Sequence, residues 1–185
     1  MAVGFVRPAR PGDAGEIARI QVATWRVAYR RLFPRPVLDG LDEQAIAGGW
    51  RDAIVAPPTG GHRVLVALEQ PASDPAYLVG FVAFGPLDED HMTPGETASP
   101  TVGGITELLV EPRWGRRGHG SRLLAAAVDH WRDDGVGAAV AWVFDQAPAM
   151  GKFLGSAGWA LDGNTRALDV DDMLVPQSRY YAALT

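Results

Sequence analysis

The sequence predicts an α/β protein: a single domain over residues 1–185 with a central mixed sheet and helices around it. Short apolar runs typical of strands alternate with longer segments in which apolar residues recur at helical spacing. With 185 residues and 47% hydrophobic content, the chain is large and apolar enough to bury one sizeable core. No internal repeat or low-complexity segment interrupts it, so we expect one domain.

The first part of the chain indicates a strand followed by two helices. Residues 3–7 form a short apolar run typical of a strand. Pro11-Gly12-Asp13 then opens a helical pattern that continues to about Arg31, because proline and an acidic residue favour the first helical turn. Prolines end this pattern at residues 33–36, and a second helix is predicted over residues 37–54.

Two strands and a long polar connection follow. Apolar runs bounded by turn residues favour strands over residues 63–69 and 77–84. The stretch from Pro86 to Pro100 is polar and shows no periodicity. A connection of that length inside a compact domain is usually functional or mobile.

The last part of the chain indicates helix, strand, helix and hairpin. A glycine-rich turn leads into an amphipathic helix that ends near Asp134. A strand is predicted over residues 138–144 and a helix over residues 148–156. The tail from Trp159 indicates a hairpin that turns around Asp171-Asp172.

The composition argues against several classes of protein. A net charge of −5 and an isoelectric point near 5.3 oppose nucleic-acid binding, which requires a basic surface. No stretch approaches the roughly 18 uninterrupted apolar residues of a membrane span, and the N-terminal residues lack the apolar core of a secretion signal. We therefore expect a cytoplasmic protein with no nucleic-acid or membrane partner. Its basic residues are almost all arginine, which suggests a GC-rich bacterial genome.

Metal and thiol chemistry have no support in the sequence. The chain contains no cysteine, which excludes a disulfide framework, a thiol nucleophile and a zinc site with cysteine ligands. The four histidines are scattered, without the spacing of a metal-binding motif. We expect no metal site.

One segment carries most of the functional information, the run ITELLVEPRWGRRGHGSRLL from Ile105 to Leu124. An apolar strand ends at a proline, passes through a turn rich in glycine and arginine, and enters an amphipathic helix. Gly118 and Gly120 allow the backbone to approach a ligand closely. The first amides of the helix have no intrahelical partner and lie at the positive end of the helix dipole, so a phosphate is the expected ligand.

Two common phosphate-binding motifs do not fit this turn. A P-loop requires lysine after its last glycine, and the only lysine of the chain is Lys152. A dinucleotide fingerprint requires a third glycine where the chain has Leu123. A purely structural glycine-rich turn remains an alternative.

The segment resembles the acyl-coenzyme A signature of the GCN5-related N-acetyltransferase (GNAT) family, R/Q-x-x-G-x-G/A after a strand that ends in Leu-x-Val and a proline. Leu108, Val110 and Pro112 match the strand, and Gly118-His119-Gly120 matches the turn. Gly115 replaces the usual Arg or Gln, with Arg116 and Arg117 beside it. The order of elements along nearly the whole chain is also that of the GNAT fold. The resemblance implies a mostly antiparallel, twisted sheet that splays at the acyl-CoA strand, with about four helices.

The resemblance implies acetyl-CoA as the cofactor. It assigns cofactor contacts to the end of the strand, to the turn and to one residue of a later helix, namely Leu108, Leu109, Val110, Arg116, Arg117, Gly118, His119, Gly120, Ser121 and Phe153. Main-chain amides would hold most of the diphosphate, and either arginine could reach a phosphate. We expect the His119 side chain to face solvent and its N–H to contact the diphosphate.

A second, weaker match covers APAMGKFLGSAGW, residues 147–159, which resembles the N-x-x-A-x-x-F-Y-x-x-x-G-F helix of the family. Phe153, Gly158 and Trp159 are in register, whereas Ala147 replaces Asn and Leu154 replaces Tyr. In many relatives this tyrosine gives a proton to the leaving thiolate, and a leucine cannot. Tyr180, Tyr181 or a water could donate instead, or the thiolate could leave unassisted; we select Tyr180.

Acetyl transfer to an amine also needs a base, because an ammonium has no lone pair. Glu107 is the leading candidate, three residues before Val110 on the signature strand and on the same face as Leu109 by period-two alternation. A backbone amide near Leu109 or Val110 could hold the carbonyl oxygen. An ion-paired structural carboxylate is an equal alternative for Glu107.

The acceptor is the least determined part of the prediction. We favour a primary amine of a small molecule over that of a protein. Trp25 and Tyr29 resemble residues of family members that face the acceptor cleft, although simple helix packing would also explain them. We expect a homodimer, because dimers are common among members of the family. Two other functions remain open: a non-catalytic acyl-CoA-binding or regulatory module, suggested by Leu154, and an interaction protein whose glycine-rich turn is structural.

Overall fold

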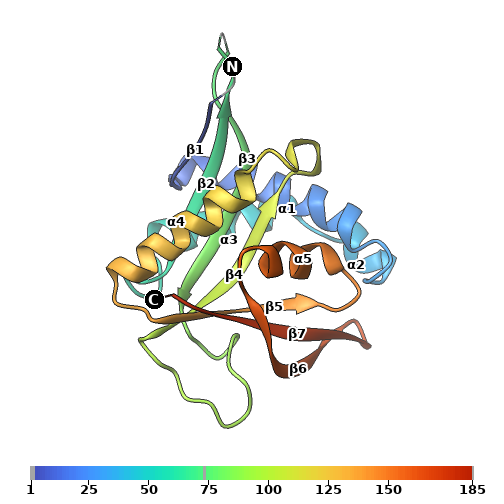
Figure 1. The fold of residues 1–185 in the computed structure, drawn as a ribbon. Coiled ribbons are helices and arrows are strands. Elements are labelled where there is room, and N and C mark those ends of the chain that lie inside the picture. The colour runs from blue at the N-terminus through green and yellow to red at the C-terminus, as the bar shows by residue number, and fades with distance from the viewer. Residues whose placement is uncertain (1–2, 73, 185) are drawn as a thin grey trace. The chain divides into compact units, whose positions relative to one another are not determined.

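The computed structural model describes residues 3–72 and 74–184. In that part of the chain, seven strands and five α-helices follow one another in the order that Figure 1 shows. The strands are β1 (Val3–Pro8), β2 (Arg63–Gln70), β3 (Tyr77–Pro86), β4 (Val102–Val110), β5 (Ala138–Phe144), β6 (Ala160–Val170) and β7 (Met173–Ala183). The helices are α1 (Ala14–Ala28), α2 (Arg35–Asp39), α3 (Glu43–Val55), α4 (His119–Asp133) and α5 (Pro148–Ser156), with short 3-10 turns η1 (Pro11–Asp13) and η2 (Pro112–Trp114).

Hydrogen bonds link the strands into a mixed sheet in the order β1-β2-β3-β4-β5-β7-β6. The pairs β1–β2, β2–β3, β5–β7 and β6–β7 are antiparallel. Val102–Ile105 of β4 pairs in parallel with Ala138–Ala141 of β5. The predicted α/β class with a mixed, mostly antiparallel sheet is confirmed, while its splaying at β4 stays a prediction.

The chain forms two compact units. Unit 1 contains Met1–Thr24, Leu41–Phe84 and Glu107–His130, and unit 2 contains Trp25–Gly40, Gly85–Thr106 and Trp131–Thr185. Four elements, α1, β3, β4 and α4, contribute residues to both units. The prediction of one domain over residues 1–185 remains a prediction.

In unit 1, helices cover both faces of β3. Phe81 and Phe84 are three residues apart on this strand, so their side chains point to opposite faces. Phe81 contacts Trp50 of α3 at a ring distance of 5.1 Å, and Phe84 contacts His130 of α4 at 6.1 Å. Because both faces are covered, the strand has a continuous apolar run instead of alternation.

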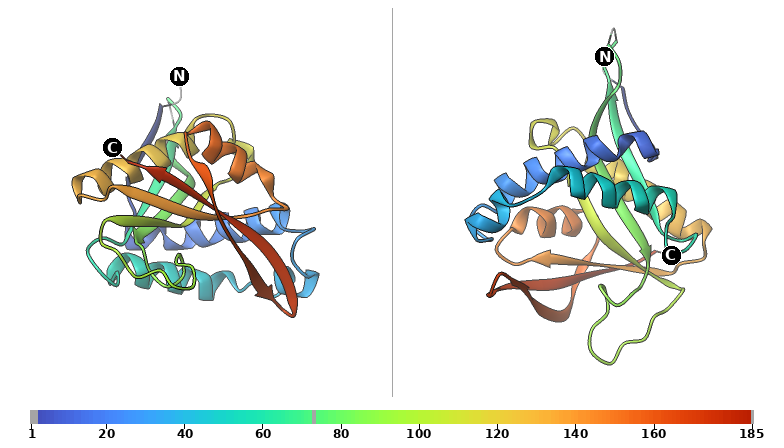
Figure 2. Two further views of the ribbon diagram at one scale, coloured as in Figure 1. Left: turned by 60° about the horizontal axis from the view of Figure 1, so that its bottom comes forward. Right: turned by 180° about the vertical axis from the view of Figure 1, so that it is seen from behind.

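The predicted helix over residues 37–54 is wrong as a single element, because the structure has two helices there. Helix α2 ends at Asp39, and Asp42 caps the start of α3 by accepting hydrogen bonds from the amides of Gln44 and Ala45 at 3.0 and 3.1 Å. Helix α3 lies alongside α1, as Figure 2 shows, and Trp50 Nε1 donates to Gln21 Oε1 at 2.6 Å.

In unit 2, β6 and β7 form the predicted hairpin, whose turn residues Asp171 and Asp172 have φ of 53° and 64°. The connection between β3 and β4 is tied to this hairpin. Buried Arg179 of β7 donates to both carboxylate oxygens of Glu96 at 2.6 and 2.7 Å, and to Asp162 of β6 at 2.7 Å. The polar segment that shows no sequence pattern is thus anchored by an ion pair.

Within the described part of the chain, no helix has the length and apolar character needed to cross a membrane.

Candidate functional site

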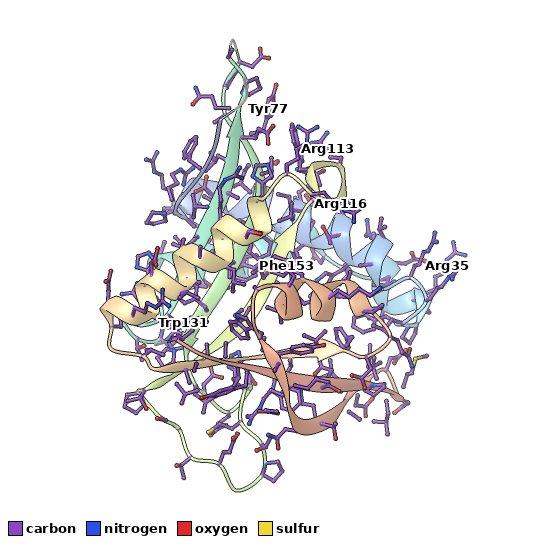
Figure 3. All side chains as sticks on the ribbon, viewed as in Figure 1. Arg35, Tyr77, Arg113, Arg116, Trp131 and Phe153 are labelled. Atoms are coloured by element: carbon purple, nitrogen blue, oxygen red, sulfur yellow. The ribbon has the colours of Figure 1, made fainter. Side chains whose placement is uncertain are left out.

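Unit 1 contains the predicted anion cradle, in the turn between β4 and α4. Arg116 and Gly118 have φ of 62° and 81°, in the left-handed region that reverses the chain direction sharply. Gly118 O accepts the first hydrogen bond of the helix, from Arg122 N at 3.0 Å. Figure 3 shows Arg113 and Arg116 at this turn.

The amides of residues 116–121 have no main-chain partner among the residues that the structure describes. They precede or begin α4, a helix of 15 residues, so they lie at the positive end of its dipole. Successive free amides, a glycine with positive φ and an exposed arginine together fit a diphosphate. The chemistry of this turn therefore matches the expected cofactor.

The end of β4 is held against β3 by a close backbone approach. A Cβ at Gly80 would lie 2.6 Å from Leu109 O, so only glycine allows this contact. Glu111 N donates to Val79 O at 2.9 Å just after the strand ends. Leu108 and Leu109 are buried, whereas Val110 is half-buried.

Glu107, the predicted base, is half-buried on the part of β4 that belongs to unit 1. It lies in the same strand as Leu108, Leu109 and Val110, two residues after Ile105, the last residue of β4 in register with β5. Its assignment as the base stays a prediction.

The base of the cradle is fixed by an ion-pair cluster. Arg19 of α1 donates to Glu111 at 3.1 Å, and Arg113 lies 3.1 Å from the same carboxylate. Burial alone would raise the pKa of Glu111, but the two arginines outweigh it and lower that pKa below its usual value. Glu111 is therefore a charged anchor for the segment that leads to the turn.

The prediction for the His119 side chain is wrong. It does not face solvent but is 2% exposed, and its Nε2 bonds with Glu69 Oε2 of β2 at 2.5 Å. Arg117 Nη1 donates to the other oxygen of Glu69 at 3.0 Å. The position after Gly118 points into the protein because it begins α4, whose inner face packs on the sheet.

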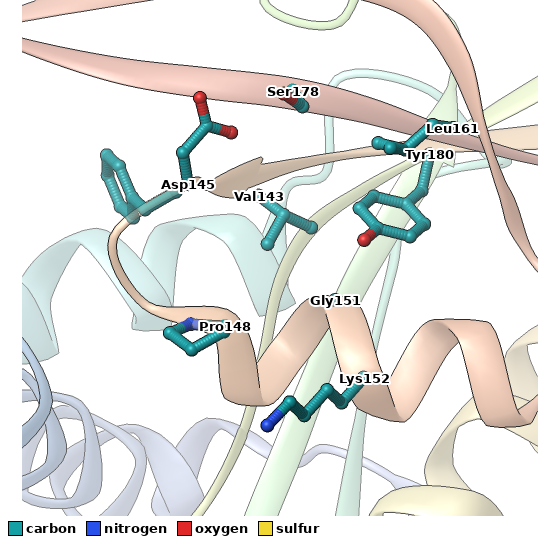
Figure 4. A pocket seen from close by; sticks show the side chains of 9 residues that line it. Val143, Asp145, Pro148, Gly151, Lys152, Leu161, Ser178 and Tyr180 are labelled. Carbon is teal, nitrogen blue, oxygen red and sulfur yellow. The ribbon is translucent and has the colours of Figure 1, made fainter.

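Unit 2 contains the other predicted site residues. Tyr180 of β7 lines a cavity of about 290 Å³ together with residues of β5, of α5 and of the turn between them, among them Asp145, Gly151 and Lys152 (Figure 4). A Cβ at Gly151 would lie 2.6 Å from Tyr180 Oη, so glycine makes room for this hydroxyl beside α5. Phe153 is half-buried on the same helix.

Leu154, which replaces the expected tyrosine, is completely buried. An apolar side chain in this environment carries no transferable proton. The hydroxyl of Tyr180 lies beside α5, close to Gly151.

Trp25 and Tyr29 belong to an aromatic cluster with Phe33 and Phe144. Their ring centroids are 5.8 Å apart, and Tyr29 lies 5.2 Å from Phe144, a residue that lines the cavity. The buried Nε1 of Trp25 has no hydrogen-bond partner among the described residues. Their part in acceptor binding stays a prediction.

Unit 1 thus brings together the residues from Glu107 to Ser121, while Phe153 and Tyr180 lie together in unit 2. Sequence reasoning missed Glu69 and Gly151. No local pattern identifies either one, because Glu69 is 50 residues from His119 and Gly151 acts only through the tyrosine that packs on it.

The mixed sheet and the free amides before α4 are chemically compatible with a cofactor that carries a diphosphate. A sequence model of the Acetyltransferase (GNAT) family matches residues 21–159, which is most of the chain. The chain belongs to this family of acetyltransferases, as its resemblance predicted. The cofactor of the family is acetyl-CoA, so that prediction is confirmed as well.

Individual relatives are more distant. The "Uncharacterized N-acetyltransferase YuaI" of Bacillus subtilis is 27% identical over 146 residues, which cover 78% of this chain and 74% of the relative. The yncA protein of Salmonella typhimurium, solved with its cofactor acetyl-CoA, has a TM-score of 0.67 and 17% identity, and 98% and 94% of the two chains are covered. PaiA N-acetyltransferase of Thermoplasma acidophilum, solved with coenzyme A, has a TM-score of 0.65 and 13% identity, with 95% and 98% covered. The two structures share the fold of this chain.

Proposed function

We propose that the protein transfers an acetyl group from acetyl-CoA directly to a primary amine of a small molecule. The observation that supports this most is the turn of free amides between β4 and α4, at the position of the family signature. When bound, acetyl-CoA supplies an acetyl group whose C–S bond breaks as the amine nitrogen forms the new C–N bond, and coenzyme A leaves as a thiol.

The proposed cofactor-binding residues fall into two groups, one that binds the diphosphate and one that contacts the thioester arm. Amides of residues 117–121 donate hydrogen bonds to the diphosphate, and the exposed Arg116 side chain supplies positive charge. Leu108, Leu109 and Val110 of β4 lie beside the thioester arm, with an amide near Leu109 or Val110 for the carbonyl oxygen, and Phe153 of α5 provides an apolar contact.

Two side chains move protons in this proposal. Glu107 removes a proton from the acceptor ammonium, directly or through water, so that nitrogen has a lone pair. Tyr180 Oη provides the proton that the departing sulfur takes up. The close fit of this hydroxyl against Gly151 supports Tyr180, since it brings a donor to the helix in which Leu154 replaces the expected tyrosine.

A small-molecule acceptor is supported by the cavity of about 290 Å³ beside Tyr180, whose volume is near the lower end of the range for ligand pockets. Asp145 at its edge offers a carboxylate to a cationic amine. Trp25 and Tyr29 would line the acceptor site through the cluster that includes Phe144. A homodimer and a cytoplasmic location remain parts of the proposal.

A second candidate is a non-catalytic acyl-CoA-binding module, and the buried Leu154 favours it. Thiol release from acetyl-CoA, measured with a panel of small primary amines and with a peptide, separates the two functions. We expect at least one small amine to support turnover, and Glu107→Gln to reduce that turnover about 100-fold. Glu43→Gln, on the exposed first turn of α3, is the matched control.

Tight binding of coenzyme A without turnover of any amine would favour the binding module. Absence of thermal protection by coenzyme A would instead contradict both functions, because a ligand that binds only the folded state raises its stability.

A further inference from the structure

A closed cluster of charges lies beneath the proposed diphosphate cradle. The Glu69 carboxylate at the end of β2 is 6% exposed, and each of its oxygens has a partner from the turn. Oε2 bonds with His119 Nε2 at 2.5 Å, and Oε1 accepts from Arg117 Nη1 at 3.0 Å. One carboxylate of the sheet thus holds two residues of the turn.

Arg122 completes the cluster from the first turns of α4. Its Nη1 donates to His119 Nδ1 and its Nη2 donates to Arg117 O, both at 3.2 Å. A guanidinium only donates, so His119 Nδ1 is the acceptor of the bond from Arg122, and the other ring nitrogen, Nε2, faces Glu69. A Cβ at Gly4 would lie 2.7 Å from Arg122 Nη1, so glycine in β1 makes room for the guanidinium.

The Arg117 guanidinium is already engaged on its edge and its face. Glu69 occupies an edge, and the ring of Trp114 lies 4.9 Å from its central carbon. Trp114 in turn stacks on Tyr77 of β3 at 6.2 Å. By contrast, Arg116 has no polar partner among the residues that the structure describes, so its charge is available to a ligand.

The charge of Glu69 explains why this arrangement matters for an anionic ligand. Burial would raise its pKa, but the hydrogen bonds from His119 and Arg117 lower it below the usual value, so the carboxylate is ionised at neutral pH. An ionised carboxylate behind the cradle would repel a diphosphate unless its charge is balanced. Arg117 is the permanent cation that balances it.

We propose that Glu69 is a positioning residue for acetyl-CoA, and that Arg117 acts on the cofactor through Glu69 and not by contacting a phosphate. Glu69 orients the turn by holding His119 and Arg117, and Arg117 cancels the negative charge that this buried carboxylate would present to the diphosphate. Arg116 then remains as the arginine that contacts phosphate. This inference rests on the proposed location of the cofactor at the turn.

A double-mutant cycle on coenzyme A binding tests the inference, with dissociation constants from calorimetry for the wild type, Arg117→Gln, Glu69→Gln and the double variant. We expect Arg117→Gln to weaken binding about 10-fold, because it removes the cation that is bonded directly to the Glu69 carboxylate. Adding Glu69→Gln removes that charge, so the double variant should recover to within about 3-fold of the wild type. The matched control is Arg116→Gln, whose loss of affinity should not be recovered by Glu69→Gln.

A different pattern would overturn the inference. If Arg117 contacts phosphate itself, the double variant binds as weakly as Arg117→Gln, and the inference is wrong. Equal affinity of Arg117→Gln and the wild type would also contradict it. Thermal unfolding without ligand identifies any variant that fails to fold. If Glu69→Gln fails to fold, Glu69→Asp replaces it in the cycle; this variant shortens the side chain but keeps the carboxylate charge. Because the charge is kept, recovery of affinity in the double variant with Glu69→Asp would contradict the inference. If the wild type does not bind coenzyme A, both the proposed function and this inference fail. If the wild type binds coenzyme A but the double variant does not recover, only this inference fails.

Discussion

The ion pair between Glu96 and Arg179 makes a quantitative prediction about stability. Hydrogen bonds from Arg179 are the largest cause that lowers the pKa of Glu96 from 4.5 to about 2. At 1.36 kcal/mol per pKa unit, a difference of about 2.5 between unfolded and folded states corresponds to ~3.4 kcal/mol. The Glu96 side chain is 34% exposed, so solvent screening reduces the contribution, and we expect about 1–2 kcal/mol at neutral pH.

The substitution Glu96→Gln tests this contribution through its pH dependence. Above the unfolded pKa near 4.5, the wild type should be more stable than the variant by the full amount. As the pH falls from about 4.5 toward 2, the unfolded chain takes up a proton before the folded one, so the difference should shrink nearly to zero. Asp162 still pairs with Arg179 in the variant, so no uncompensated buried charge obscures the result.

Urea unfolding followed by circular dichroism at pH 7, 5, 3 and 2 provides the free energies of unfolding. Glu89→Gln is the matched control, since Glu89 is an exposed carboxylate in the same connection, and we expect it to change stability by less than about 0.5 kcal/mol. A difference between wild type and Glu96→Gln that stays constant from pH 7 to pH 2 would refute the electrostatic reasoning.

Three other predictions concern the cradle, the proposed acid and a helix cap. Gly120→Asp should abolish coenzyme A binding in calorimetry, because it places bulk and negative charge where the phosphate would lie; unchanged affinity would contradict the cradle. Tyr180→Phe should lower kcat about 100-fold with little change in Tm, and Gly151→Ala, whose added methyl would lie 2.6 Å from Tyr180 Oη, should lower kcat in the same direction. An unaltered kcat in Tyr180→Phe would exclude it as the acid. Asp42→Ala should cost about 1 kcal/mol in urea unfolding, because two amides at the start of α3 lose their acceptor, and a loss below about 0.3 kcal/mol would show that the cap is not needed.

Elements with a complete local signal could be predicted closely from the sequence. The strand over residues 138–144 and the helix over residues 148–156 have the predicted bounds in the structure. An apolar run preceded by glycines marks the strand, and Pro148 marks the first turn of the helix. Asp171 and Asp172 form the predicted turn because two short polar residues tolerate positive φ between strands.

Elements with conflicting local signals could not be predicted closely from the sequence. Leu38 and Leu41 continue one apolar pattern across Gly40, which favoured a single helix. The competing signal was Asp42, which precedes Glu43 and accepts from the amides that follow, as a helix cap does. Capping outweighs the apolar spacing here because the free amides of a new helix need an acceptor.

For the site, the sequence predicted the backbone chemistry but not the side-chain partners. The glycines and free amides of the cradle are local features of residues 116–121, so their pattern is visible in one segment. The burial of His119 depends on Glu69, which reaches it only because the sheet brings β2 to the start of α4. A residue pair of that separation leaves no periodic signal, and the solvent-facing prediction failed for this reason.

The most direct test of the account is a crystal structure of this protein with coenzyme A. We expect the diphosphate oxygens to lie within about 3.2 Å of main-chain nitrogens between Arg117 and Ser121, with the Arg116 side chain nearby and the Arg117 side chain still on Glu69. A diphosphate bound elsewhere on the protein, with these amides contacting only solvent, would contradict the central claim.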